Sequence, residues 1–155
     1  MVSFTTHSTL PSRHGVGDLG PEAHHFIAWC AEAGLGWWQM LPVGPIGPGD
    51  SPYSSSSAFA GEPLYLSLER LVDDGLLAST DVQAPTALAR GKVQYGAARA
   101  FKEPRLHEAF HRWLKRGGSR KAYDTFCADA ATWLDPYSHY VGGDHESTRF
   151  LQYEF

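Results

Sequence analysis

The residues best suited to chemistry lie in one irregular segment, Gly44–Pro63, which reads GPIGPGDSPYSSSSAFAGEP. Within it, Asp50, Ser51 and Tyr53 are followed by a serine tract. Short carboxylate and hydroxyl groups hydrogen-bond to sugar hydroxyls, and an aromatic ring packs against the apolar face of a sugar ring. The segment therefore predicts a carbohydrate-binding loop. From composition alone, a flexible loop in which Asp50 makes a local turn hydrogen bond is the more frequent arrangement.

A second pattern, H-E-x-x-H, occupies His107–His111. On a helix it places His107 and His111 one turn apart with Glu108 as a general base, which is the arrangement of a zinc hydrolase. The third ligand would have to be one of three later aspartates, Asp124, Asp129 or Asp135. Because so short a pattern often arises by chance, a solvated histidine pair is the favoured interpretation, and a zinc hydrolase is the alternative.

The overall charge argues against partners that are held by bulk electrostatics. The 155 residues carry a formal net charge of -4, so neither a nucleic acid nor a membrane surface is expected as a partner. One basic group lies around a predicted helix end and is interpreted as a solvated face: Arg112, Lys115, Arg116, Arg120 and Lys121. The oligomeric state is left open.

The expected location is the cytoplasm. No run reaches the roughly 18 apolar residues of a membrane-spanning helix. The N-terminus lacks the basic start and apolar stretch of a secretory signal. The two cysteines, Cys30 and Cys127, do not form a disulfide framework, which favours a reducing compartment.

The first part of the chain predicts a βαβ unit. Met1–His7 contains a short alternating pattern, Ser8–Gly20 is rich in turn residues, and Pro21–Ala33 has the apolar spacing of a helix. Gly36–Val43 is almost continuously apolar, which is typical of a strand buried on both faces of a parallel sheet. Both loops that follow the strands then meet at the edge where parallel sheets bind ligands, and the second of them is Gly44–Pro63.

The rest of the chain is predicted to be mostly helical. A short helix follows Leu64, and a longer one starts near Gly96, where Pro104 either kinks it or begins a second helix. The buried stripe of the longer helix comprises Leu106, Phe110, Trp113 and Leu114. A further helix is expected to end at Pro136, and its buried face comprises Tyr123, Phe126, Cys127, Ala130 and Leu134.

Two long motifs point to a family. HSTLPSRHGVGDLGPEA, and then WWQMLPVGPIGPGDSPYSSSSAFAGEPL, resemble the N-terminal part of the 4-alpha-glucanotransferases, also called amylomaltases or disproportionating enzymes. The motifs occur in the right order and without gaps. The resemblance spans nearly the whole chain and becomes loose after about Tyr95.

The resemblance implies an enzyme on a (β/α)8 barrel with helical insertions. Such enzymes transfer alpha-1,4-glucan segments between maltooligosaccharides by retaining double displacement, with two carboxyl groups and no cofactor. By matching motif, Asp50, Ser51 and Tyr53 would line the sugar sites. Val2–Leu10 would be the first barrel strand with its exit, and Trp37–Leu41 the second.

The length is a departure from this picture. A complete barrel needs roughly 250 residues, and the family's motifs for the catalytic carboxylates do not occur in this chain. Asp18, in Gly-Asp-Leu-Gly, belongs to the N-terminal loop motif and not to the acid/base site. The sequence is therefore expected to be the first two strands of a barrel over 1–63, a helical insertion over 64–141 and the start of a further segment over 142–155.

Such a chain is expected to be inactive alone, with no catalytic residues and no metal of its own. A non-catalytic glucan-binding remnant of the same ancestry is the second alternative to a glucanotransferase. An alpha-1,4-glucan or maltooligosaccharide is the expected partner in either case.

Overall fold

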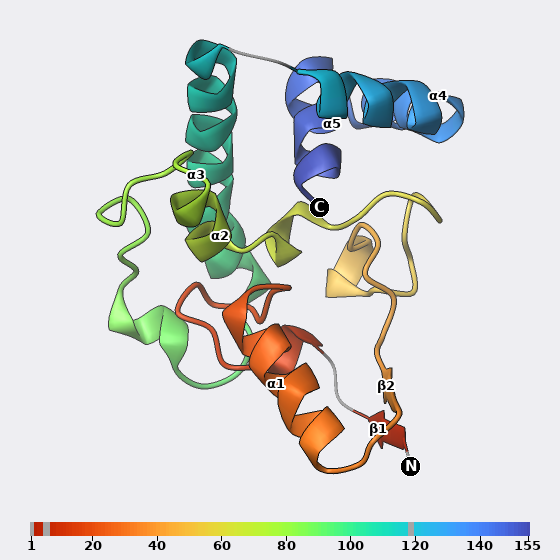
Figure 1. Ribbon diagram of the computed structural model, residues 1–155. Helices are drawn as coiled ribbons and strands as arrows, with labels where there is room; N and C mark the ends of the chain where they lie inside the picture. The colour runs from red at the N-terminus through yellow and green to blue at the C-terminus, as the bar shows by residue number, and fades with distance from the viewer. Residues whose placement is uncertain (1, 5–6, 118–119) are drawn as a thin grey trace.

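The computed structural model describes residues 2–4, 7–117 and 120–155, with backbone only for 2–4. Figure 1 shows the strands and the first α-helix gathered at one end of the molecule, with the C-terminal helices at the other. The strands and α-helices are β1 (Val2–Phe4), α1 (Pro21–Glu32), β2 (Trp37–Gln39), α2 (Leu68–Asp73), α3 (Tyr95–Arg116), α4 (Lys121–Val141) and α5 (His145–Glu154). Short 3-10 turns lie at His7–Thr9, Pro48–Asp50, Pro63–Tyr65 and Thr86–Ala89.

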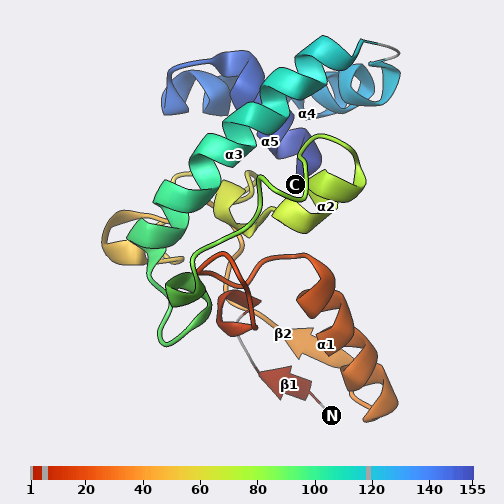
Figure 2. The ribbon, with the colours of Figure 1, turned by 90° about the vertical axis from the view of Figure 1, so that its left-hand side faces the viewer.

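The predicted βαβ unit is present. β1 and β2 pair in parallel, with Val2 opposite Trp37, and α1 makes the connection between them. Figure 2 shows the two strands side by side with α1 next to them. α1 begins at Pro21, whose fixed φ suits the first helical turn, and the chain leaves the helix through Gly34 at a φ of 72°.

The prediction that the second strand is buried on both faces is wrong. β2 covers only three residues, and the side chain of Trp37 is 76% exposed. Trp38 is partly buried because its ring meets that of Phe26 on α1, with centroids 4.9 Å apart. In the described residues β2 pairs only with β1, and α1 lies against one face, so nothing covers Trp37.

The prediction that the later helix ends at Pro136 is also wrong, because α4 continues to Val141. A proline inside a helix removes one backbone donor. Near this point the carbonyl oxygen of Asp135 lies 2.9 Å from Ser138 Oγ and 2.8 Å from His139 Nδ1. These side chains give the backbone local polar contacts. Pro104 lies inside α3, which is one helix rather than two.

The main core lies among α2, α3, α4 and α5. Phe110 on α3 and Phe150 on α5 are buried at its centre, with ring centroids 5.6 Å apart. A smaller cluster joins Val16 from the N-terminal loop to Tyr65 and to Ala98 on α3. In the described part of the chain, no helix combines the length and the apolar character needed to span a bilayer. The core therefore fixes the N-terminal loop and the Gly44–Pro63 segment to the helices.

Candidate functional site

The predicted sugar loop, Gly44–Pro63, makes a tight turn at its first half. The amide of Gly47 donates to the carbonyl oxygen of Ser51 at 3.0 Å, which closes the turn. Gly49 and Asp50 both take left-handed conformations, with φ of 72° and 57°. Asp50 is the one non-glycine residue with positive φ in the described chain. Aspartate tolerates this region better than most residues, so its type is matched to the turn.

The serine tract hydrogen-bonds to the loop itself. Ser57 Oγ accepts from the amides of Phe59 and Ala60 at 3.2 and 3.0 Å. Ser55 Oγ donates to the carbonyl oxygen of Ser57 at 2.8 Å. These contacts shape the loop backbone, which leaves fewer free hydroxyls for a ligand than the sequence suggests.

Two polar residues that sequence reasoning missed anchor the loop. The buried Glu62 carboxylate accepts from the amide of Ile46 at 2.8 Å and from that of Leu64 at 3.2 Å. Gln152 on α5 binds both backbone groups of Gly61, accepting at 2.8 Å and donating at 3.0 Å. Gly61 and Gln152 are 91 residues apart, and no periodic pattern could have revealed that pairing.

A cavity of about 420 Å³ lies beside this loop. Tyr53 and Phe59 line it, and their side chains are 74% and 72% exposed. The ring of Phe59 stacks on Trp133 of α4 with a centroid distance of 6.2 Å. Exposed aromatic rings beside a hollow offer flat apolar surface to a ligand.

The structure separates the three predicted sugar-site residues. Tyr53 lines the cavity, whereas Asp50 and Ser51 lie in the turn before it and outside its lining. Asp50 is exposed, and Ser51 is partly buried, with its Oγ accepting from the Tyr53 amide at 3.3 Å. Ser51 therefore positions Tyr53. A sugar-binding role for the three residues stays a prediction.

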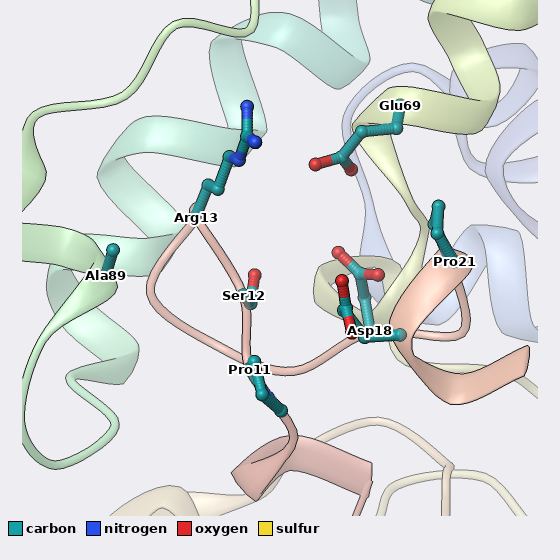
Figure 3. Close-up of a pocket in the computed structure, with 8 residues that line it drawn as sticks. Pro11, Ser12, Arg13, Asp18, Pro21, Glu69 and Ala89 are labelled. Atoms are coloured by element: carbon teal, nitrogen blue, oxygen red, sulfur yellow. The ribbon is translucent and has the colours of Figure 1, made fainter. Parts of the chain in front are cut away.

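A second cavity, of about 460 Å³, lies between the N-terminal loop and α2. Figure 3 shows the Asp18 and Glu69 carboxylates turned toward the same space, with Arg13 across from them. Gly20 brings the loop against Ser67, the N-cap of α2, so closely that any side chain at Gly20 would collide with it. The loop and the helix start therefore meet at this cavity.

A buried ion pair supports the same loop. Nζ of Lys102, on α3, lies 3.0 Å from Oδ2 of Asp18, and the two side chains are 0% and 9% exposed. Burial raises the pKa of Asp18 and lowers the pKa of Lys102, and their mutual attraction opposes both shifts. Asp18 Oδ1 also accepts from the Gly20 amide at 3.1 Å. Asp18 thus has a structural partner in Lys102.

The H-E-x-x-H pair lies on the exposed side of α3. The rings of His107 and His111 have centroids 4.8 Å apart. Glu108, the expected general base, accepts from Arg112 Nε at 2.8 Å. Among the residues that the structure describes, no third ligating side chain joins the pair. The structure gives no support to the zinc hydrolase alternative.

Comparison with known proteins gives the family. The sequence profile of 4-alpha-glucanotransferase matches residues 6–151. The chain belongs to the 4-alpha-glucanotransferase family. Its relatives include the 4-alpha-glucanotransferase of Thermus thermophilus, 40% identical over 136 residues, which are 86% of this chain and 26% of that protein. The chloroplastic/amyloplastic enzyme of Solanum tuberosum is 34% identical over 155 residues, covering 96% of this chain and 27% of that protein.

A solved structure has the same fold over the matched part. The amylomaltase from Streptococcus agalactiae in complex with acarbose superposes with a TM-score of 0.87 at 22% sequence identity. The match covers 98% of this chain and 38% of that chain. The chain thus spans about a quarter of the length of the curated relatives it matches.

Proposed function

We propose that this chain binds glucan and forms part of the sugar-binding surface of a 4-alpha-glucanotransferase. The observation that carries the proposal is the anchored loop that presents Tyr53 and Phe59 beside a cavity. Family membership supports it, as does the structural neighbour, which was solved in complex with acarbose. The ligand class is an alpha-1,4-glucan or maltooligosaccharide, whose sugar faces would stack on the exposed rings.

In this proposal the N-terminal βαβ unit is the beginning of a (β/α)8 barrel. Residues 1–63 supply the first two strands and the sugar loop, 64–141 the helical insertion and 142–155 the start of a further segment. Asp50 and Ser51 would hydrogen-bond to sugar hydroxyls at the rim, next to Tyr53. The setting is cytoplasmic.

The reaction is retaining transfer of a glucan segment, and its two carboxyl groups belong to motifs that these 155 residues do not contain. The chain alone is therefore expected to bind glucan without transferring it. Incubation of the purified chain with maltotriose should release neither glucose nor longer maltodextrins. Disproportionation by the pure chain would show that its own residues can catalyse.

Binding is tested by NMR titration of the labelled chain with maltoheptaose. Amide signals of the 44–60 region should shift, and Tyr53→Ala should weaken binding. Tyr140→Ala is the matched control, because Tyr140 on α4 is 73% exposed and does not line the loop cavity. Equal effects of the two substitutions, or no shifts in the loop at saturating glucan, would refute the proposed site.

A further inference from the structure

His14, in the N-terminal loop, carries a buried nitrogen without a hydrogen-bond partner. Its side chain is 1% exposed, and Nε2 lies 3.0 Å from the carbonyl oxygen of Val82. A carbonyl oxygen only accepts, so Nε2 carries the proton in the neutral ring and Nδ1 carries the lone pair. Nδ1 is buried and makes no hydrogen bond, and it lies 3.6 Å from Oε2 of Glu69.

Two electron-pair donors thus face each other across a short gap. A metal ion between His14 and Glu69 would accept a lone pair from each and so remove this conflict.

The spacing fits a small metal ion. Zn²⁺ binds His nitrogen and carboxylate oxygen at roughly 2.0–2.2 Å, so two ligands in a tetrahedron lie about 3.4 Å apart. The His14–Glu69 distance of 3.6 Å is close to that value. One ligand atom each from His14, Asp18 and Glu69 lies within 4.8 Å of the other two. A small rotation of a side chain closes the remaining gap.

The neighbouring polar groups would orient these ligands. Lys102 holds Asp18 Oδ2 at 3.0 Å, and Ser67 Oγ donates to Glu69 Oε2 at 3.1 Å. Each carboxylate oxygen has two lone pairs, so these contacts leave an acceptor site free on each. Val82 holds the His14 ring in the tautomer that a metal requires, as outer-shell carbonyls do in metal sites.

We propose that His14, Asp18 and Glu69 form a binding site for a divalent transition-metal ion of the zinc type. One nitrogen and two oxygen donors suit Zn²⁺, whereas Ca²⁺ and Mg²⁺ prefer sites built from oxygen alone. Asp18 and Glu69 line the cavity of about 460 Å³, from which water can supply the fourth ligand. The ion would fasten the N-terminal loop to the start of α2. Neither the family match nor the sugar loop requires this site.

The test is a zinc titration of the complete 155-residue chain, stripped of metal and followed by competition with a chromophoric chelator. One Zn²⁺ per chain is expected. His14→Phe keeps the ring that stacks on Phe101 at 5.5 Å but removes both nitrogens. Because even outer-shell changes weaken metal binding roughly 10- to 100-fold, His14→Phe and Glu69→Gln should each weaken it by at least that much.

The matched control is the double substitution His107→Ala, His111→Ala, which removes the exposed histidine pair and should leave the affinity unchanged. Wild-type chain gives an independent measurement, because the ¹⁵N shift of His14 Nδ1 should move on zinc addition whether or not the variants fold. Failure to bind one zinc per chain, an unmoved His14 signal, or loss of zinc in the control variant would each overturn the proposal.

Discussion

Nζ of Lys102 lies 3.0 Å from Oδ2 of Asp18, and both side chains are buried. The two residues are 84 positions apart, so the pair fastens the N-terminal loop to the middle of α3. Glu69 and Glu62 add further negative potential that favours the charged form of Lys102. The loop that follows β1 is therefore held by the helical part of the chain.

Removal of one partner of this pair should be strongly destabilising. In Lys102→Met the Asp18 carboxylate stays buried without its cation, and such a change costs about 3–5 kcal/mol of unfolding free energy. Urea denaturation measures the loss. The double variant Lys102→Met, Asp18→Asn should lose less than the sum of its single variants, because it leaves no unpaired charge. Strict additivity would contradict the direct coupling.

Glu108→Gln is the control for that experiment. Glu108 pairs with Arg112 at 2.8 Å, but the two side chains are 49% and 36% exposed. Exposed pairs are screened by water and salt, so this variant should lose far less stability than Lys102→Met. A similar loss in both variants would show that burial does not decide the effect.

The conformation of the sugar loop should depend on Gly47. A Cβ there would run into the carbonyl group of Ser54, which is backbone and cannot rotate away. Gly47→Ala should therefore distort the loop and weaken maltoheptaose binding, with the helical core intact. Gly36→Ala is the control, because a Cβ at Gly36 would meet nothing within 4 Å. The measurement is NMR titration together with far-ultraviolet circular dichroism, and unchanged glucan binding in Gly47→Ala would contradict this role.

Local patterns predicted the helices well but could not reveal what covers each face. Pro21 and the spacing of apolar residues located α1, and the glycine-bounded run located β2. Trp37 would be buried only if another element packed against its face of the sheet. A local sequence pattern does not show whether such an element is present. Because proline disfavours the helix interior, the sequence predicts a helix end at Pro136, yet α4 continues past it and packs against α5.

The candidate site was predictable only in part. The motif around Asp50 and Tyr53 identified the loop, because the residue types of a contiguous motif can be read directly from the sequence. Glu62 and Gln152, which anchor that loop, act through contacts formed only in the folded chain. The same holds for His14 and Glu69, which are distant in sequence and carry no shared motif.

His7 should make the fold sensitive to mild acid. It is 1% exposed, neither ring nitrogen has a hydrogen-bond partner, and its ring meets Tyr65 edge-on at 4.1 Å. Burial lowers its pKa below the ordinary 6.5, so below pH 6.5 the unfolded chain takes up a proton that the folded chain does not. Stability should therefore fall as the pH decreases from 6.5.

His7→Phe keeps the aromatic contact and should flatten that slope. Burial also lowers the pKa of His14, so part of the dependence of stability on pH will remain in this variant. The measurement is the urea midpoint at several pH values, with chelator present to keep metal out. His24→Gln, an exposed position on α1, should keep the wild-type slope. A His7→Phe slope equal to that of the wild-type chain would contradict the assignment.

Glu154, on α5, should produce the opposite dependence. Burial and the nearby charge of Asp74 raise its pKa to about 7. Between the ordinary value of 4.5 and about 7, the unfolded chain has released a proton that the folded chain still holds. Stability should therefore fall as the pH rises through this window and level off above it.

Glu154→Gln removes the ionisable group and keeps a similar shape. The variant should be more stable than wild type at pH 8 and close to it at pH 4, where the carboxyl is protonated in both states. The measurement is the thermal midpoint across this range, with Glu108→Gln as a control that should follow the wild-type curve. His7 lowers stability only toward acid pH. If the Glu154→Gln variant gains thermal stability only above about pH 5, the ionisation of Glu154 is therefore the source of that gain. An equal gain at every pH would instead indicate a packing effect.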